Sequence, residues 1–314
     1  MKNIIKIASF SLLAASPMLA SIHAADYPIR PVKFVVPWPP GDLEDTLTRI
    51  IAKEMSSETG IPASVLNKPG GGGVVGATEV ARSRNDGSVI GSFVADLLTT
   101  QLHSGNTSYQ KDAFEPIGIF LEYPFVIATR SKQPYNTLEE LATYSNNNKV
   151  SLGHFGYQAL PTALTYKAAD QLNIQFSSDA AFDNNDCPVL LNGDADVVTT
   201  TISQINACMQ TGEVKLLASI TRERLSISPQ TPTLKEITNI SQTTWNGLFV
   251  KKGTSDKIKN RIAEIAEAAV NTVKAQSYVA TTGAGIFWIG KKESEKIIEK
   301  DFQASKALLK YMKN

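Results

Sequence analysis

Short apolar runs alternate with longer amphipathic stretches along the first third of the chain. Apolar runs of this kind, bounded by Gly, Pro or charged residues, are typical of buried strands. Between them, apolar residues recur at helical spacing, as from Leu43 to Met55, before Gly60 provides a helix stop. We therefore predict strands over 33–37, 62–66 and 89–94 and helices over 43–60 and 74–84. This order of elements is typical of a parallel sheet.

A second series of the same kind begins near residue 150. We predict strands over 150–152, 174–176, 197–201 and 214–220, and helices over 138–146, 161–172, 187–191 and 204–211. The repetition indicates a second α/β domain. The apolar run 116–129, which contains Pro124, is either two strands or one long bent crossing.

The C-terminal part carries two more amphipathic patterns. One predicted long helix has on a single face Ile258, Ile262, Ile265, Ala269 and Val273. Another, near the end of the chain, has on a single face Ile297, Ile298, Phe302, Leu308 and Tyr311. The run Trp245–Val250, which precedes both, is predicted as a return crossing into the first domain.

Two α/β lobes joined by two crossings predict a cleft between them. In open α/β sheets the ligand lies outside the carboxyl ends of the strands. The candidate binding loops are therefore residues 37–45, 95–100, 153–158 and 199–203.

Composition indicates a compartment and excludes several classes. Of 314 residues, 42% are hydrophobic and 19% charged, which is enough for a large core and unlike a disordered chain. Residues 1–25 are typical of a secretory signal peptide, since Lys2 and Lys6 precede an apolar stretch, and we expect cleavage after Ala24 or Ala25. Its removal takes two lysines from the 31 Lys and Arg, leaving 29 against 30 acidic residues. This balance, with no basic run, argues against nucleic-acid binding.

Two local patterns have more than one interpretation. Gly71–Gly76 fits G-x-G-x-x-G, with Asp96 further on, which indicates either a dinucleotide site or a glycine turn packed on a helix start. We favour the glycine turn, because a Lys-Pro pair separates the glycines from the preceding strand. Asp42 stands at a predicted helix start, where it either caps the helix or faces the cleft.

No pattern for catalysis or metal binding is present. The chain lacks G-x-S-x-G and H-E-x-x-H, and the two histidines beyond the leader, His103 and His154, are far apart in sequence. We therefore expect a protein that is not an enzyme, with no metal site and no cofactor. The two cysteines, Cys187 and Cys208, are either a disulfide or two buried thiols.

Motifs in the same order along most of the chain resemble one family. They are Tyr27-Pro28, Val36-Pro37-Trp38-Pro39-Pro40-Gly41 with Asp45 and Arg49, Asn67-Lys68-Pro69-Gly70, Asn192-Gly193 with Asp196, and Trp245 with Gly247-Leu248-Phe249. The chain thereby resembles the solute-binding proteins of tripartite tricarboxylate transporters, also called Bug proteins. The resemblance implies a type II-like, two-lobed periplasmic binding fold. Such a protein closes on a small ligand, usually a carboxylate, and delivers it to membrane permease subunits.

The resemblance also implies how the lobes and the site are organised. Lobe 1 would comprise residues 26–125 and 245–314 and lobe 2 residues 126–244, in a monomer. Together with the loop predictions, it gives as candidate ligand-binding residues Trp38, Pro40, Gly41, Asp42, Asp45, Ala95, Asp96, His154, Phe155, Gly156, Tyr157, Gln158, Phe182, Asp183, Thr200 and Thr201.

The candidate pocket departs from the family pattern. Asp42 stands where the family has a second Gly, and the loop His154–Gln158 keeps only Gly156 of a small, Ser/Thr-rich loop. An amphoteric, cationic or aromatic ligand would suit the acidic and aromatic candidates, which are Asp42, Asp96, Phe155, Tyr157 and Phe182. Alternatively, these side chains point away from the cleft or cap helices. Two other functions stay open from sequence, namely ligand sensing for a membrane signalling partner and an exported enzyme.

Overall fold

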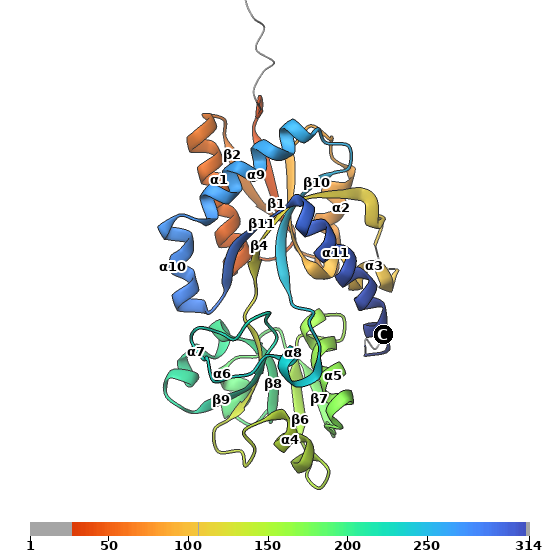
Figure 1. Ribbon diagram of the computed structural model, residues 1–314, viewed down its shortest axis with the longest axis vertical. Coiled ribbons are helices and arrows are strands. Elements are labelled where there is room, and N and C mark those ends of the chain that lie inside the picture. Colours follow the sequence, from red (N-terminus) through yellow and green to blue (C-terminus); the bar gives the residue numbers. More distant parts are fainter. Residues whose placement is uncertain (1–26, 106, 312–314) are drawn as a thin grey trace, which may run out of the picture.

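The computed structural model describes residues 27–105 and 107–311, and the chain forms two lobes that lie one above the other in Figure 1. Each lobe is built on its own sheet with helices packed against it. The two-lobed α/β architecture predicted from the sequence is confirmed. The predicted signal peptide, residues 1–25, lies outside the described residues.

The upper lobe in Figure 1, which is lobe 1, is built on a six-stranded sheet. Its strands are β1 (Val32–Val36), β2 (Ala63–Asn67), β3 (Val89–Val94), β4 (Phe114–Glu122), β10 (Trp245–Lys251) and β11 (Gly285–Gly290). β1 pairs in parallel with β2 and β3, whereas β10 lies antiparallel between β3 and β4. The strand order is β11-β4-β10-β3-β1-β2.

Helices cover both faces of this sheet. They are α1 (Leu43–Thr59), α2 (Val74–Arg82), α3 (Thr100–Ser104), α9 (Asp256–Val270), α10 (Val273–Thr282) and α11 (Lys291–Ser305), with short 3₁₀ turns η1 (Gly71–Gly73), η2 (Ala95–Leu98), η3 (Lys111–Ala113) and η4 (Lys306–Tyr311). Adjacent β1 residues belong to separate cores, since Phe34 packs with α1 and α9 and Val35 packs with α2. This separation follows from the alternation of side chains across a strand.

The lower lobe in Figure 1, which is lobe 2, is built on a five-stranded sheet in the order β7-β6-β8-β5-β9. The strands are β5 (Phe125–Arg130), β6 (Ser151–His154), β7 (Ser178–Ala181), β8 (Val197–Thr201) and β9 (Val214–Ser219), and the helices are α4 (Leu138–Ser145), α5 (Leu160–Leu172), α6 (Cys187–Leu191), α7 (Ile202–Gln210) and α8 (Leu234–Thr238). Apolar residues of α4 and α5 share one core with the sheet, and those of α6 and α7 share another with its opposite face.

The first helix shows why much of the local structure could be predicted. Leu47, Ile51 and Met55 of α1 are fully buried, as their helical spacing indicates. Gly60 ends the helix in the left-handed conformation, with φ at 70°. Glycine adopts that conformation at little cost, so it is the residue expected at this stop.

Two crossings join the lobes. Tyr123 and Pro124 lie between β4 in one sheet and β5 in the other, so the apolar run 116–129 is two strands. The chain returns after β9 to enter β10, and the predicted return crossing at Trp245–Val250 is confirmed. This division of strands supports the lobe ranges expected from the sequence, which we retain as a proposal.

Two local predictions were wrong. The strand expected at 174–176 is β7 instead, because Ile174 is a buried connection residue whereas β7 is a largely exposed edge strand without an apolar run. Val273 does not belong to the long helix, because α9 ends earlier and the Thr272 side chain caps a new helix, α10. Val273 is consequently 88% exposed. Within the described ranges, no helix has both the length and the apolar character needed to cross a membrane.

Candidate ligand cleft

The loop after β1 is fixed by Asp45, which is 2% exposed. Its carboxylate accepts hydrogen bonds from the Gly41 nitrogen at 3.0 Å, from Asn67 Nδ2 at 2.8 Å and from Arg49 Nε at 2.9 Å. Burial raises the pKa of Asp45, but these hydrogen bonds outweigh burial and hold it below its ordinary value. Both Asp45 oxygens are engaged within lobe 1, so this candidate orders the loop.

The exposed tip of the same loop consists of Pro39 to Asp42. Asp42 stands at the N-cap position of α1, but its side chain accepts no capping hydrogen bond, so the capping interaction considered from the sequence is not made. Desolvation, and then repulsion by Asp45, raises the pKa of Asp42. Trp38 is half-buried, and its Nε1 has no hydrogen-bond partner among the described residues.

The glycine-rich segment packs tightly against this loop. Gly76 in α2 leaves no room for a side chain, since an added Cβ would lie 3.1 Å from the Pro37 Cα and 3.0 Å from the Lys68 carbonyl oxygen. Gly73, before it, has a φ of 87°. The glycines therefore serve the close packing of a turn on the start of α2, which is the interpretation favoured from the sequence.

Glu44 is a residue that the sequence analysis did not select. It is 3% exposed, and its Oε2 accepts a hydrogen bond from the Tyr123 hydroxyl at 2.8 Å, so it lies beside the first crossing. Burial, and then the charge of Asp42, raises the pKa of Glu44 to about 7. Its position in the helix could have identified it in the sequence, because Glu44 lies one turn before Thr48 on the buried side of α1.

Asp96 joins the two lobes directly. It lies in η2 after β3, is 8% exposed, and its Oδ2 accepts a hydrogen bond from the Leu160 nitrogen of α5 at 3.2 Å. Its Oδ1 is buried and has no partner among the described residues. Burial raises the pKa of Asp96 to about 6. Ala95, the neighbouring candidate, is fully buried.

Three carboxyl groups act together at the first crossing. Burial, and then the charge of Glu44, raises the pKa of Tyr123 well above its ordinary value. Asp42 and Asp96 contribute to the same rise, so all three carboxyls lie within electrostatic range of this hydroxyl. Within the described chain, no Lys or Arg is among the causes that shift the pKa of Asp42, Glu44 or Asp96. This part of the lobe junction is therefore acidic.

Asp179 holds the loop of lobe 2 that contains His154 to Gln158. His154 is fully buried; its Nδ1 accepts from the Gly156 nitrogen at 2.9 Å, and its Nε2 lies 3.3 Å from Asp179 Oδ1. Because Nδ1 accepts, Nε2 carries the proton and donates to the carboxylate. The Tyr157 hydroxyl donates to the same carboxylate oxygen. His154 and Tyr157 thus order the loop through Asp179.

The remaining candidates differ in exposure and contacts. Phe155 is half-buried and packs edge-on against Phe125, with ring centroids 5.7 Å apart. Gly156 has a φ of 90° with open space around it, and Gln158 is half-buried. In the neighbouring loop, Phe182 is half-buried and Asp183 is exposed.

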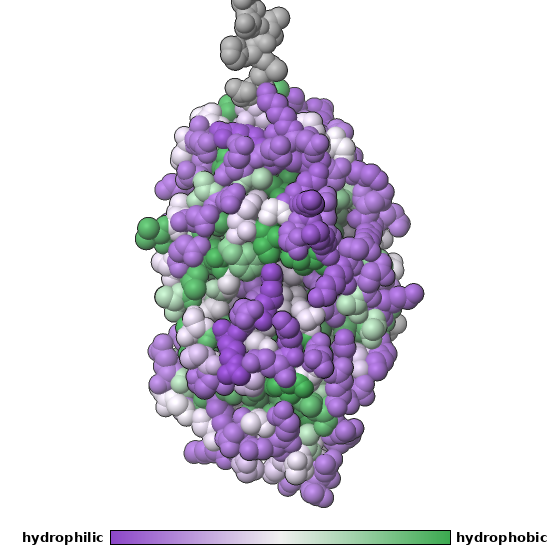
Figure 2. Space-filling view, viewed as in Figure 1, coloured by the Kyte–Doolittle hydropathy of each residue, from purple (hydrophilic) through white to green (hydrophobic). Residues whose placement is uncertain are grey.

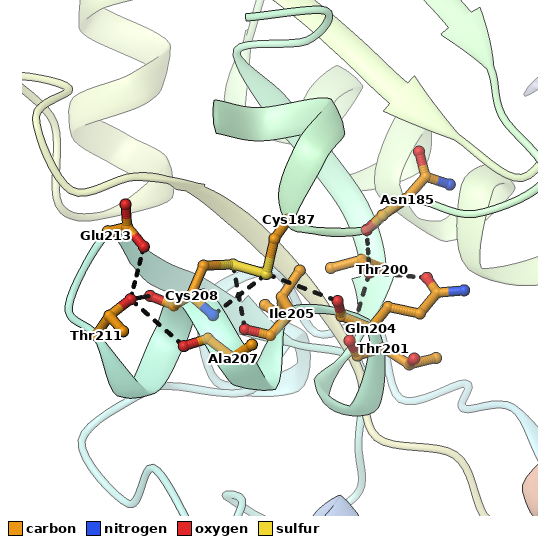
Figure 3. Close-up of a disulfide and its surroundings, with 10 residues drawn as sticks. All are labelled: Asn185, Cys187, Thr200, Thr201, Gln204, Ile205, Ala207, Cys208, Thr211 and Glu213. Atoms are coloured by element: carbon orange, nitrogen blue, oxygen red, sulfur yellow. Dashed lines mark hydrogen bonds between the residues drawn. A yellow bond between two sulfur atoms is a disulfide. The ribbon is translucent and has the colours of Figure 1, made fainter. Parts of the chain in front are cut away.

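The two threonines are engaged within lobe 2. The Thr200 hydroxyl donates to the Asn185 carbonyl oxygen at 2.6 Å (Figure 3). The Thr201 hydroxyl lies 2.9 Å from Ser203 Oγ. The Cys187–Cys208 pair beside them forms a disulfide with Cα atoms 5.9 Å apart, which is the first of the two alternatives left by the sequence. The disulfide ties the start of α6 to α7, and so anchors the loop that contains Asp183.

A second charged contact crosses between the lobes. Arg222, which follows β9, donates through Nε to Glu122 Oε1 at the end of β4, at 2.9 Å.

On the face shown in Figure 2 the surface is mostly hydrophilic, with apolar residues gathered low on the upper lobe and in a patch on the lower lobe. No group of three His, Cys, Asp or Glu side chains in the part of the chain that is described could hold a metal ion.

Known proteins share this architecture. BugT of Bordetella pertussis is 27% identical over 263 residues, which cover 78% of this chain and 78% of BugT. A TctC solute binding protein from Polaromonas matches with a TM-score of 0.78 at 27% identity, over 90% of this chain and 99% of that one. MatC of Rhodopseudomonas palustris, solved with bound malate, shares the fold with a TM-score of 0.74 at 22% identity, over 90% of this chain and 100% of MatC.

Two α/β lobes joined by two crossings match the architecture of BugD, a periplasmic binding protein. A family model described as the tripartite tricarboxylate transporter family receptor matches residues 47–313. The chain therefore belongs to this family, together with the TctC and Bug solute-binding proteins, and the resemblance seen in its motifs is confirmed. This is a family of solute receptors and not a family of enzymes.

Proposed function

We propose that this protein is exported to the periplasm, captures a small organic solute between its lobes, and presents the solute to the membrane subunits of a tripartite transporter. Family membership and the two-lobed fold support the proposal. The observation that carries it is the junction of the lobes, where the buried carboxyl of Asp96 in lobe 1 meets the first turn of α5. On this proposal residues 1–25 are a cleaved signal peptide, the protein acts as a monomer, and binding involves no catalysis.

The solute that fits this junction carries an ammonium group or other N–H donors. Glu44 and Asp96 are buried, and among the described residues no Lys or Arg is a cause that lowers their pKa. A ligand carboxylate placed beside them would bring like charges together out of water, which is strongly unfavourable. An ammonium or amide group would instead pair with these oxygens, so an amphoteric or cationic solute is favoured over a plain dicarboxylate such as malate.

Aromatic side chains provide surface for the apolar part of such a solute. Phe125 and Phe155 pack edge-on at the mouth of lobe 2, and Tyr123 lies 5.9 Å from Phe125 between ring centroids. Stacking or cation–π contact on such a surface contributes about 0.5–2 kcal/mol. We assign to Phe155 a contact with the solute, and to His154 and Tyr157 the ordering of the loop.

Mass spectrometry of small molecules that co-purify with the native protein would identify the solute class. Calorimetry with amino acids, amines, aromatic acids and simple dicarboxylates then measures the preference directly. We expect micromolar or tighter binding by an amine-bearing solute and weak or no binding of succinate. Tight binding of succinate by the wild type, unchanged in Asp42→Gly and Asp96→Ser, would contradict the assigned ligand class.

A matched control separates a local effect from a general change in charge. Asp112 is an exposed carboxylate that pairs with Lys252 away from the cleft. Asp112→Ser removes the same charge as Asp96→Ser, and it should leave the affinity for every solute in the panel unchanged. Loss of affinity in both variants would indicate a nonspecific electrostatic effect.

A further inference from the structure

The N-terminus of α5 is completed by a residue of the other lobe. Ala159 stands at the N-cap position and offers no side-chain acceptor, and Pro161 in the first turn has no N–H. Asp96 Oδ2 accepts from the Leu160 nitrogen at 3.2 Å. The carboxylate therefore stands where the unpaired N–H groups and the helix dipole favour a negative charge.

Asp96 is itself fixed by lobe 1. It lies in η2 directly after β3, and its carbonyl oxygen accepts from the Thr99 nitrogen at 3.2 Å. It is 8% exposed, and its second carboxylate oxygen, Oδ1, is buried without a partner among the described residues. A buried carboxylate with one unpaired oxygen is costly for folding. Its placement is thus better explained by a role between the lobes than by the stability of lobe 1.

Apolar side chains of both lobes surround this contact. Leu97 and Leu98 of η2 and Leu160 and Leu164 of α5 belong to one buried cluster, which also includes Leu308 of η4. In Figure 1 the C-terminal end of the chain descends beside α5, consistent with this shared cluster. Exclusion of water strengthens a charged hydrogen bond, so the Asp96 contact lies where it has the largest effect.

We propose that Asp96 is an interlobe clasp: its carboxylate, carried by lobe 1, caps α5 of lobe 2 and stabilises the closed arrangement through a contact within the chain. The clasp itself does not depend on the proposed function. Only its effect on ligand specificity rests on that proposal. The end of the cleft at α5 is occupied by the chain's own carboxylate, which excludes a ligand carboxylate there.

Amide hydrogen exchange and small-angle X-ray scattering of ligand-free protein test the clasp. In Asp96→Ala, amides over 159–165 should exchange about tenfold faster, because a charged hydrogen bond at a helix N-terminus is lost. The radius of gyration should also increase as the lobes separate. Asp96→Asn keeps an acceptor and loses the charge, so its exchange rate should fall between those of Asp96→Ala and the wild type.

Asp42→Ala is the matched control, since it removes a carboxylate from the cleft that makes no hydrogen bond to α5, and it should exchange like the wild type. If both Asp96 variants show the amide exchange rates and the radius of gyration of the wild type, the proposed clasp is wrong. If circular dichroism shows that Asp96→Ala does not fold, Asp96→Asn alone decides, and wild-type exchange in it overturns the proposal. Because no solute is added, these results are independent of solute binding, which the calorimetric panel tests separately.

Discussion

At the scale of single residues, neighbouring carboxyl groups at the start of α1 have opposite environments. Asp45 and Glu44 are 2% and 3% exposed, respectively. Asp45 accepts hydrogen bonds from three residues and has a lowered pKa, whereas Glu44 accepts from the Tyr123 hydroxyl and has a raised pKa. The helical pattern of the sequence could place both near the buried side. It could not supply the distant partners, which are Asn67 for Asp45 and Tyr123 for Glu44.

The raised pKa of Glu44 predicts a stability cost that grows with pH. The group ionises near 4.5 in the unfolded chain and near 7 in the folded protein, so the folded state binds the proton more tightly. Stability from this group is therefore present below about pH 4.5, falls as the pH rises to about 7, and stays lower above. Glu44→Gln cannot ionise and should be more stable than the wild type by about 2–3 kcal/mol at pH 8, but equal to it near pH 4.

Urea unfolding at a series of pH values from 4 to 8 measures this difference. Glu58→Gln, at an exposed position of the same helix, is the matched control. A constant difference between Glu44→Gln and the wild type at every pH would show that the carboxyl is not the titrating cause.

Asp45 should show the opposite pH dependence. Its folded pKa is lowered, so its contribution is present above the unfolded value of 3.8 and is lost as the pH falls through the folded pKa. Asp45→Ala leaves Asn67 and Arg49 without their acceptor and should lower the free energy of unfolding by about 2–3 kcal/mol at pH 7. Urea unfolding extended down to pH 3 should show this loss becoming smaller. An equal loss at pH 3 and pH 7 would assign the effect to packing instead of charge.

At the scale of elements, the apolar pattern predicted most strands and helices well, but it misplaced one edge strand, β7, and missed another, β11. β3 and β8 occupy the predicted ranges because their side chains are largely buried; β8 is a continuous β-branched run, and β3 has apolar residues at both of its ends. The predicted position of β7 was wrong because this largely exposed edge strand has no apolar run in its sequence. β11 was not predicted, and its pairing with β4 shifts register between Ile286 and Ile289, which breaks the simple alternation.

The disulfide is the prediction that belongs to this scale. Cys187 and Cys208 close a loop with a sequence separation of 21 and tie α6 to α7. In the chain-entropy model, loss of a cross-link of this size lowers the free energy of unfolding by about 3 kcal/mol. The double variant Cys187→Ser, Cys208→Ser should therefore unfold at lower urea concentration, and the reduced wild type should match it. If oxidised and reduced wild type unfold together, the disulfide does not stabilise the fold.

At the scale of the whole molecule, the topology predicted two lobes with candidate loops at the strand ends, but not how the lobes meet. The rule for open α/β sheets placed candidate loops at the strand ends, and the Asp96–Leu160 hydrogen bond joins the loop after β3 to the start of α5. Further interlobe contacts, such as those of Arg222 with Glu122 and of Tyr311 with Asp170, join residues far apart in sequence. No periodicity or local motif encodes such pairs, because they depend on the relative placement of two complete lobes.

A solute that bridges the lobes should stabilise the whole molecule without being consumed. Binding to the native state alone contributes about 2.7 kcal/mol at a concentration 100 times Kd, and the gain should grow by a further 1.4 kcal/mol for each tenfold increase in concentration. Thermal unfolding at a series of solute concentrations measures this dependence, and a solute from the panel that shows no heat of binding serves as the control. Asp42→Gly with Asp96→Ser should shift the curve for an amine-bearing solute to higher concentration, since the acceptors for its N–H groups are removed. Steady, protein-dependent disappearance of the stabilising solute, followed by chromatography, would show turnover and contradict a receptor that only binds.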